Sequence, residues 1–241
     1  MKKTEKVSNV IQEFSRFATE YEQYNIIQSK VATTLVSMLP LSHYQTIIDL
    51  GAGSGKAYQN LMAEKITFQE FIALDSSKEM LALHPNGSSI KKICADFNLP
   101  QTFEQLKRKE EVMLLSSSAL QWSRNLDFTF SQLSKVSQNA FFAIFTSNTF
   151  KTLHRIAGVS SPIHTTEALK KAINTYYKAS YTIEEYTLHF NSVEEMLRYI
   201  KRSGVSGGER KLGYKEIKTL IKQYPLEYLE FEVLFVKAEK K

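Results

Sequence analysis

The chain of 241 residues contains 43% apolar and 12% aromatic residues, which is enough to build a hydrophobic core and excludes a disordered protein. No run approaches the roughly 18 uninterrupted apolar residues of a membrane-spanning helix, and the charged first ten residues do not resemble a secretory signal. The single cysteine, Cys94, excludes an internal disulfide, so we expect a reducing cytoplasmic location.

The formal net charge of +6 is distributed unevenly along the chain. Residues 1–150 hold 15 Lys and Arg against 14 Asp and Glu, whereas residues 151–241 hold 16 against 11. The C-terminal part therefore carries a net charge of +5 and favours an acidic partner. Nucleic acid, an anionic membrane surface and an acidic protein all fit this charge, and so does an ordinary solvated basic surface.

Apolar residues recur at helical spacing through residues 1–39, which predicts two N-terminal helices that end before Pro40. Short apolar runs then alternate with helical patterns. Strands are predicted at residues 45–50, 70–74, 90–95, 111–115 and 140–146. Helices are predicted at 57–64, 78–83 and 127–137, with a loop after the third strand. This alternation indicates a parallel sheet with helices on both faces.

The last third of the chain has a different pattern. Residues 148–178 are predicted to form helices joined by loops, inserted as a lid after the fifth strand. A strand is expected at 181–190, and a helix begins at Ser192, where Glu195 completes a capping box. A helix at 215–223 and a closing strand at 228–236 follow. One face of the closing strand is predicted to hold Leu229, Phe231, Val233 and Phe235.

The segment Asp49-Leu50-Gly51-Ala52-Gly53-Ser54-Gly55 follows a predicted strand and opens a helix. It fails the nucleoside-triphosphate loop pattern, because Ala57 follows Gly55-Lys56 and Leu50 occupies the position of the first glycine. It also fails the dinucleotide pattern, because the sixth position is Lys56. What remains is an acidic residue followed by three alternating glycines. This pattern resembles the first motif of Rossmann-like S-adenosylmethionine-dependent methyltransferases.

The ends of the next strands carry matching polar residues. Asp75 ends the second strand, 24 residues after Gly51, where a carboxylate accepts hydrogen bonds from both ribose hydroxyls. A helix N-cap role for Asp75 is compatible with that role. Met80 follows at a helical step, where it either lies against an adenine face or packs in the core.

Two further strand ends complete the predicted cofactor site. Asp96 ends the third strand, where it can accept from the adenine amino group while Phe97 packs nearby. The fourth strand ends in three serines beginning at Ser116, which leave room for the methionine part. The five histidines show no metal-ligand spacing, so we expect no metal. The prediction is S-adenosylmethionine as methyl donor and S-adenosylhomocysteine as product.

Beyond the core, the chain resembles the malonyl-acyl-carrier-protein O-methyltransferase family of biotin synthesis. Three stretches carry the resemblance: residues 14–21 leading to Gln28, the Ala119-Leu120-Gln121-Trp122 segment, and residues 196–205 with the basic segment that follows. The resemblance implies one domain with a Rossmann-like, seven-stranded, mostly parallel sheet. Its predicted parts are N-terminal helices (1–40), a cofactor-binding core (41–147), a lid (148–178) and C-terminal strands and helices (179–241).

The resemblance also implies a reaction and a set of site residues. A methyl group would pass to the free carboxylate of a malonyl thioester, which is ionised at neutral pH and needs no general base. Arg16, Tyr21 or Arg155 would position that carboxylate. An acidic acyl carrier protein would meet Arg198, Lys201 and Arg202. The cofactor-binding residues would be Tyr21, Gln28, Asp49, Gly51, Gly53, Asp75, Met80, Asp96, Phe97 and Ser116.

Two alternative functions stay open at this point. A methyltransferase of a small molecule, such as a quinone precursor, would share the cofactor residues and differ in the lid. A nucleic-acid-binding protein would use the basic C-terminal part, but no RNA-binding module pattern supports it. We therefore expect a cytoplasmic monomer whose partner is a carrier protein rather than nucleic acid or a membrane.

Overall fold

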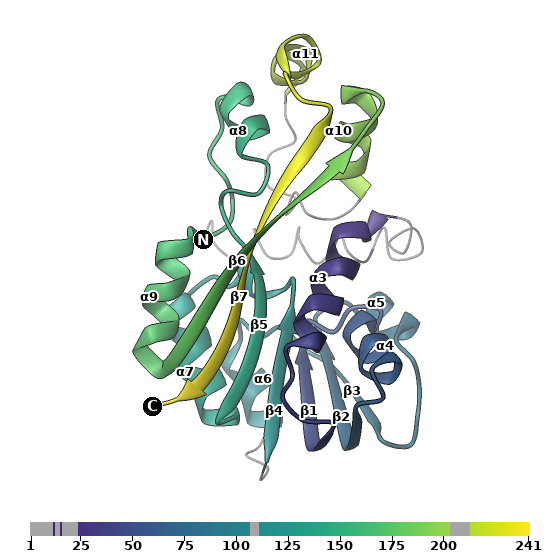
Figure 1. Ribbon diagram of the computed structural model, residues 1–241, viewed down its shortest axis with the longest axis vertical. Helices are drawn as coiled ribbons and strands as arrows, with labels where there is room; N and C mark the ends of the chain where they lie inside the picture. Colours follow the sequence, from purple (N-terminus) through teal and green to yellow (C-terminus); the bar gives the residue numbers. More distant parts are fainter. Residues whose placement is uncertain (1–11, 13–14, 16–23, 107–110, 203–212) are drawn as a thin grey trace.

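The structure is a computed structural model that describes residues 12, 15, 24–106, 111–202 and 213–241. Seven strands form one sheet in the order β3-β2-β1-β4-β5-β7-β6 (Figure 1). Strands β1 to β5 are parallel, whereas β7 runs antiparallel to both β5 and β6. The strands are β1 His43–Leu50, β2 Thr67–Asp75, β3 Ile90–Cys94, β4 Val112–Ser117, β5 Asn139–Phe145, β6 Tyr177–His189 and β7 Tyr228–Lys240. The predicted Rossmann-like sheet is confirmed.

Helices cover both faces of the sheet because the strands alternate apolar side chains between two buried clusters. Helices α3, α4 and α5 contribute to the first cluster, and α6, α7 and α9 contribute to the second. Helices α8, α10 and α11 extend the first cluster beyond the carboxyl ends of β1 and β4 (Figure 1). The helices are α3 Ile26–Ser37, α4 Lys56–Ala63, α5 Lys78–Leu83, α6 Pro100–Gln105, α7 Leu126–Val136, α8 Lys151–Ala157, α9 Thr166–Tyr176, α10 Val193–Arg202 and α11 Tyr214–Gln223.

The closing strand β7 is buried on both faces. Its predicted face of four apolar residues lies in the first cluster, and Leu234, Val236 and Ala238 lie in the second. The strand also runs four residues past its predicted end, because the charged tail pairs with neighbours on both sides. Glu239 lies opposite both Asn139 of β5 and Lys178 of β6.

Two differences from the sequence prediction concern helices. Helix α6 forms where a loop was expected. Pro100 occupies its first turn, and the side chain of Phe103 on the same helix is buried. The segment 148–178 was expected to be one lid, but its two helices have different surroundings. Leu169 and Ile173 of α9 are fully buried in the second core cluster, whereas α8 packs beside α11. The first N-terminal helix lies outside the described residues apart from 12 and 15.

The capping box at the start of α10 is confirmed. Ser192 Oγ accepts from Glu195 N at 3.1 Å, and Glu195 reaches back to Asn191 N at 3.0 Å. Among the described residues, no helix is long and apolar enough to cross a membrane. Over the same residues, no three His, Cys, Asp or Glu side chains gather as a metal site would require.

Candidate active site

The glycine loop lies where the strand order reverses. Strand β1 lies between β2 and β4, so β2 and β3 lie on one side of it and β4 and β5 on the other. In open α/β sheets, ligands bind at the carboxyl ends of the strands beside such a reversal of strand order. The N–H groups of Gly51 and Ala52 donate to Leu74 O at 2.7 and 2.9 Å. Gly51 has φ +78°, and a Cβ there would lie 2.2 Å from Ala119 Cβ. Close packing on Ala119 therefore requires glycine at this position.

Asp75 holds the second part of the loop. Its Oδ2 accepts from Gly53 N at 2.9 Å and its Oδ1 accepts from Ser77 N at 2.8 Å. Desolvation raises the pKa of Asp75, while these backbone bonds lower it. Met80 is buried, and its Cε lies 3.4 Å from the position of a Cβ on Gly53. Met80 thus packs in the core and also borders the loop. Its position is therefore compatible with both predicted roles, core packing and contact with the adenine face.

Asp49 is a buried carboxyl under the loop. It is 1% exposed, and among the described residues its Oδ1 has no hydrogen-bond partner. Burial raises the pKa of Asp49 to about 7, and the nearby charge of Asp75 raises it as well. Its charge state therefore changes near neutral pH, at the end of the central strand.

Asp96 is joined to the loop after β4 across the edge of the site. Its Oδ2 accepts from Arg124 Nη2 at 2.6 Å, and its Oδ1 accepts from both nitrogens of Asn98 at 2.9 Å. Phe97 is 9% exposed and packs in the second core cluster. Sequence reasoning missed Arg124, because β3 and β4 are separated in the sheet by β2 and β1 and no local pattern links them.

The serines after β4 divide into two kinds. Ser116 is fully buried and donates from Oγ to Leu50 O at 2.8 Å, so its hydroxyl ties β4 to β1. This bond gives Ser116 a structural role, and its predicted place beside the methionine part of the cofactor stays a prediction. The hydroxyls of Ser117 and Ser118 are buried without a partner among the described residues, and so is Oε1 of Gln28 on α3.

These groups fit the predicted cofactor. An adenosyl group has ribose hydroxyls and an amino group that suit the carboxylates of Asp75 and Asp96, and its ring suits the apolar surfaces of Met80 and Phe97. The unpaired oxygen of Asp49 joins the serine and glutamine atoms as acceptors and donors for a charged amino-acid part. When bound, S-adenosylmethionine supplies an electrophilic methyl group; the chain supplies its binding and orientation.

Of the three predicted substrate-positioning residues, the structure describes one. Arg16 and Tyr21 lie outside the described residues. Arg155 is exposed on α8, near the end of the molecule that lies beyond the strand ends (Figure 1). Nothing in the described residues places Arg155 against the glycine loop, so its role stays a prediction.

The predicted carrier-binding cluster on α10 stays a prediction, and its members differ in their surroundings. Arg198 is exposed, and the side chain of Lys201 lies outside the described residues. Arg202 is half-buried, and its Nη1 donates to Tyr24 Oη at 2.8 Å while the guanidinium stands 5.5 Å from the Tyr24 ring centroid. Arg202 therefore holds the segment before α3, because the tertiary fold brings Tyr24 beside α10.

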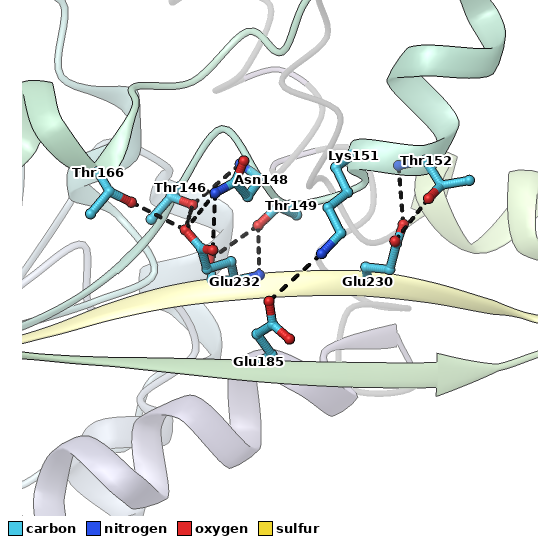
Figure 2. A network of polar contacts seen from close by, with 9 residues as sticks. All are labelled: Thr146, Asn148, Thr149, Lys151, Thr152, Thr166, Glu185, Glu230 and Glu232. Atoms are coloured by element: carbon cyan, nitrogen blue, oxygen red, sulfur yellow. Dashed lines mark hydrogen bonds and ion pairs between the residues drawn. The ribbon is translucent and has the colours of Figure 1, made fainter.

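A second polar network fixes the chain where it leaves β5 (Figure 2). Glu232 of β7 is 9% exposed, and its carboxylate accepts from Thr146, Asn148 and Thr166. Thr149 adds backbone bonds to the same residue at 3.2 Å. Both ends of the inserted segment 148–165 are thus attached to one residue of the sheet. Sequence reasoning did not identify Glu232, because its partners lie 66 to 86 positions away.

Comparisons with known proteins agree with this geometry, although no family model matches the chain. The chain is 25% identical over 253 residues to the malonyl-[acyl-carrier protein] O-methyltransferase of Marinomonas sp. (strain MWYL1), covering 94% of this chain and 92% of that protein. It is 24% identical over 208 residues to the enzyme of that name from Bacteroides fragilis, covering 82% of this chain and 41% of that longer protein. The chain is an S-adenosylmethionine-dependent methyltransferase.

Solved structures share the fold of this methyltransferase. The YcgJ protein of Bacillus subtilis superimposes with a TM-score of 0.64 at 11% identity, over 88% of this chain and 99% of that one. A geranyl diphosphate methyltransferase in complex with GPP and sinefungin gives a TM-score of 0.51 at 14% identity, over 86% and 77%. At these identities the likeness shows the fold, and the methyl acceptor has to be argued separately.

Proposed function

We propose that this methyltransferase transfers the methyl group of S-adenosylmethionine to the free carboxylate of a malonyl thioester on an acyl carrier protein, giving the methyl ester, as in an early step of biotin synthesis. The observation that carries the proposal is the similarity over 94% of the chain to a protein named for that reaction. The match extends beyond the cofactor core. This matters because the fold of the core is shared by enzymes with many functions, so the segments outside it carry the specificity for the acceptor.

The chemistry of the proposed acceptor suits the groups at the strand ends. A malonyl carboxylate is already ionised at neutral pH, so transfer requires alignment of the oxygen with the methyl group and exclusion of water. Asp75, Ser117 and Gln28 are proposed to hold and orient the cofactor for this transfer. Arg16, Tyr21 and Arg155 are proposed to hold the acceptor carboxylate by charge-assisted hydrogen bonds.

The proposal is tested with the purified chain and S-adenosylmethionine. Malonyl-carrier protein, malonyl-pantetheine, a quinone precursor and RNA are offered as separate acceptors, and methylated products are identified by mass spectrometry. We expect the methyl ester of the malonyl thioesters, sensitive to mild base. Methylation of the quinone precursor or RNA with both malonyl thioesters untouched would refute the proposal.

A further inference from the structure

Helices α8 and α11 pack side by side and present most of their cations to solvent. We call this set of side chains the basic face: Lys151, Arg155, Lys215, Lys218 and Lys222, all of them exposed. The two helices contain one acidic residue, Glu216. Seven residues of α8 and ten of α11 carry five cations and one acid, a net charge of +4, and Lys151 also pairs with Glu185 of β6 at 3.6 Å, which offsets part of that charge.

An exposed apolar pair borders the basic face. Ile217 and Ile221 on α11 are 37% and 42% exposed, and their spacing of four residues places them one above the other. Leu220 is the residue of α11 that faces the core, with no exposed surface. At 100° per residue, Lys218 and Lys222 form the next row beside the isoleucines. The outer side of α11 therefore combines apolar contact area with positive charge, as interface cores and rims do.

The location of the basic face matches that of the site. Helix α8 begins six residues after the carboxyl end of β5, and the strand ends of β1 and β4 hold the glycine loop and serines. Figure 1 shows α8 and α11 at the end of the molecule beyond these strand ends. A protein bound there would lie at the same end of the sheet as the glycine loop, where the cofactor's methyl group is expected.

We propose that the basic face, with Ile217 and Ile221, is the docking surface for the acidic carrier protein that presents the malonyl thioester. This inference rests on the proposed function, and it replaces the α10 cluster, because Arg202 is bound to Tyr24. Complementary charge steers a protein to its surface and sets its orientation, and the apolar pair supplies contact area for an amphipathic helix of the partner.

The test reverses charge on the basic face and compares it with an equal change elsewhere. The test variant is Lys215→Glu, Lys218→Glu, Lys222→Glu. The control variant is Lys135→Glu, Lys178→Glu, Lys237→Glu, whose exposed lysines lie in the last turn of α7, at the start of β6 and near the end of β7. We expect the test variant to raise the KM for malonyl-carrier protein about tenfold and the control to change it less than twofold. Neither should alter the KM for malonyl-pantetheine.

Further measurements separate the possible outcomes. Ile217→Ser with Ile221→Ser should raise the same KM without changing its salt dependence. An unchanged KM in the test variant, or equal increases in both charge variants, would overturn the docking surface while the proposed function stands. Wild type that methylates neither thioester would overturn the proposed function itself. Loss of binding to vesicles of anionic lipid in the test variant, with the carrier KM unchanged, would assign the face to membranes and overturn the proposal.

Discussion

Asp75 braces the glycine loop with both of its carboxylate oxygens. Its bonds to Gly53 N and Ser77 N fix the loop and the start of α5, so the residue proposed to hold the ribose also shapes the loop. Ribose hydroxyls would add hydrogen bonds to a carboxylate that these backbone groups already orient, because a carboxylate has about four acceptor sites. The Asp75 side chain therefore has a structural role in the loop in addition to its proposed role in binding the cofactor.

Asp75→Asn should weaken S-adenosylmethionine binding by about 2 kcal/mol, roughly 30-fold in Kd, because a charged acceptor becomes an amide with a single acceptor oxygen. Titration calorimetry measures Kd, and circular dichroism checks the fold. Glu64→Gln, an equal charge change at an exposed position just after α4, should leave Kd unchanged. Equal affinities of the Asp75 variant and wild type would contradict the ribose assignment.

Asp49 should make stability depend on pH. Burial raises its pKa to about 7, so the folded chain binds a proton there that the unfolded chain releases near its usual value of about 4. The contribution of Asp49 to the free energy of unfolding is therefore full below pH ~4 and is lost as pH rises to about 7 and above. Urea unfolding from pH 5 to 8 should show wild type losing stability relative to Asp49→Asn. Parallel profiles for the two proteins would show that Asp49 does not titrate in this range.

Contacts between elements decide how the edges of the site are held. Two of these contacts centre on a polar side chain. Arg202 joins α10 to the segment before α3, beside the Tyr24–Tyr199 ring contact, and Glu232 joins β7 to the chain after β5 and to α9. Both connect elements that are far apart in sequence. The loops that border the site therefore depend on the packing of elements that contribute no cofactor residue.

Arg202→Ala should lower the free energy of unfolding by about 1–2 kcal/mol, because a hydrogen bond and a cation–π contact to Tyr24 are lost. It should also raise the Kd for S-adenosylmethionine several-fold, since Gln28 follows Tyr24 by one helical turn. Arg198→Ala, on the exposed side of the same helix, should change neither quantity. A double-mutant cycle with Tyr24→Phe checks the contact; a coupling energy of zero would contradict it.

Glu232→Ala should cost about 3 kcal/mol of stability, because the buried hydroxyls of Thr146 and Thr166 lose their acceptor. Glu232→Gln keeps one acceptor oxygen and should cost less. Urea denaturation measures both, with Glu239→Ala on the exposed end of the same strand as the control. A cost for Glu232→Ala no larger than for the control would show that the network contributes nothing to stability.

At the scale of the whole molecule, positive charge gathers at the end that lies beyond the carboxyl ends of the parallel strands. Residues 1–150 are nearly neutral at +1, and the positive charge gathers in residues 151–241. The fold places two of the helices from this region, α8 and α11, together at one end. A field of this kind acts over the Debye length of about 10 Å at 0.1 M salt and steers association rather than chemistry.

Raising salt from 50 to 500 mM should therefore raise the KM for malonyl-carrier protein by about tenfold, with kcat nearly constant, because screening slows charge-steered association. The KM for malonyl-pantetheine, which lacks the acidic protein, should stay within twofold. The measurement is steady-state methyl transfer at several salt concentrations. The same salt dependence for both acceptors would show that the charge of the protein partner is irrelevant.

The sequence alone was sufficient for the features that local patterns encode. Short apolar runs predicted the parallel strands, which are buried on both faces, and alternating residues predicted the last two strands. The spacing of Asp49, Gly51 and Asp75 indicated the cofactor loop. The ends of parallel strands necessarily meet at one edge of the sheet, so their polar residues were predictable without coordinates. The capping box of α10 was equally local.

The tertiary structure decided what depends on contacts between distant segments. Arg124 donates to Asp96 across two intervening strands. Arg202 donates to Tyr24 Oη, and Ser116 Oγ donates to Leu50 O. In each case a polar side chain takes the partner that packing brings within about 3 Å, and the partner's sequence position carries no local signal. The order of the strands and the packing of the helices set these distances. Both result from the burial of apolar side chains contributed by all parts of the chain.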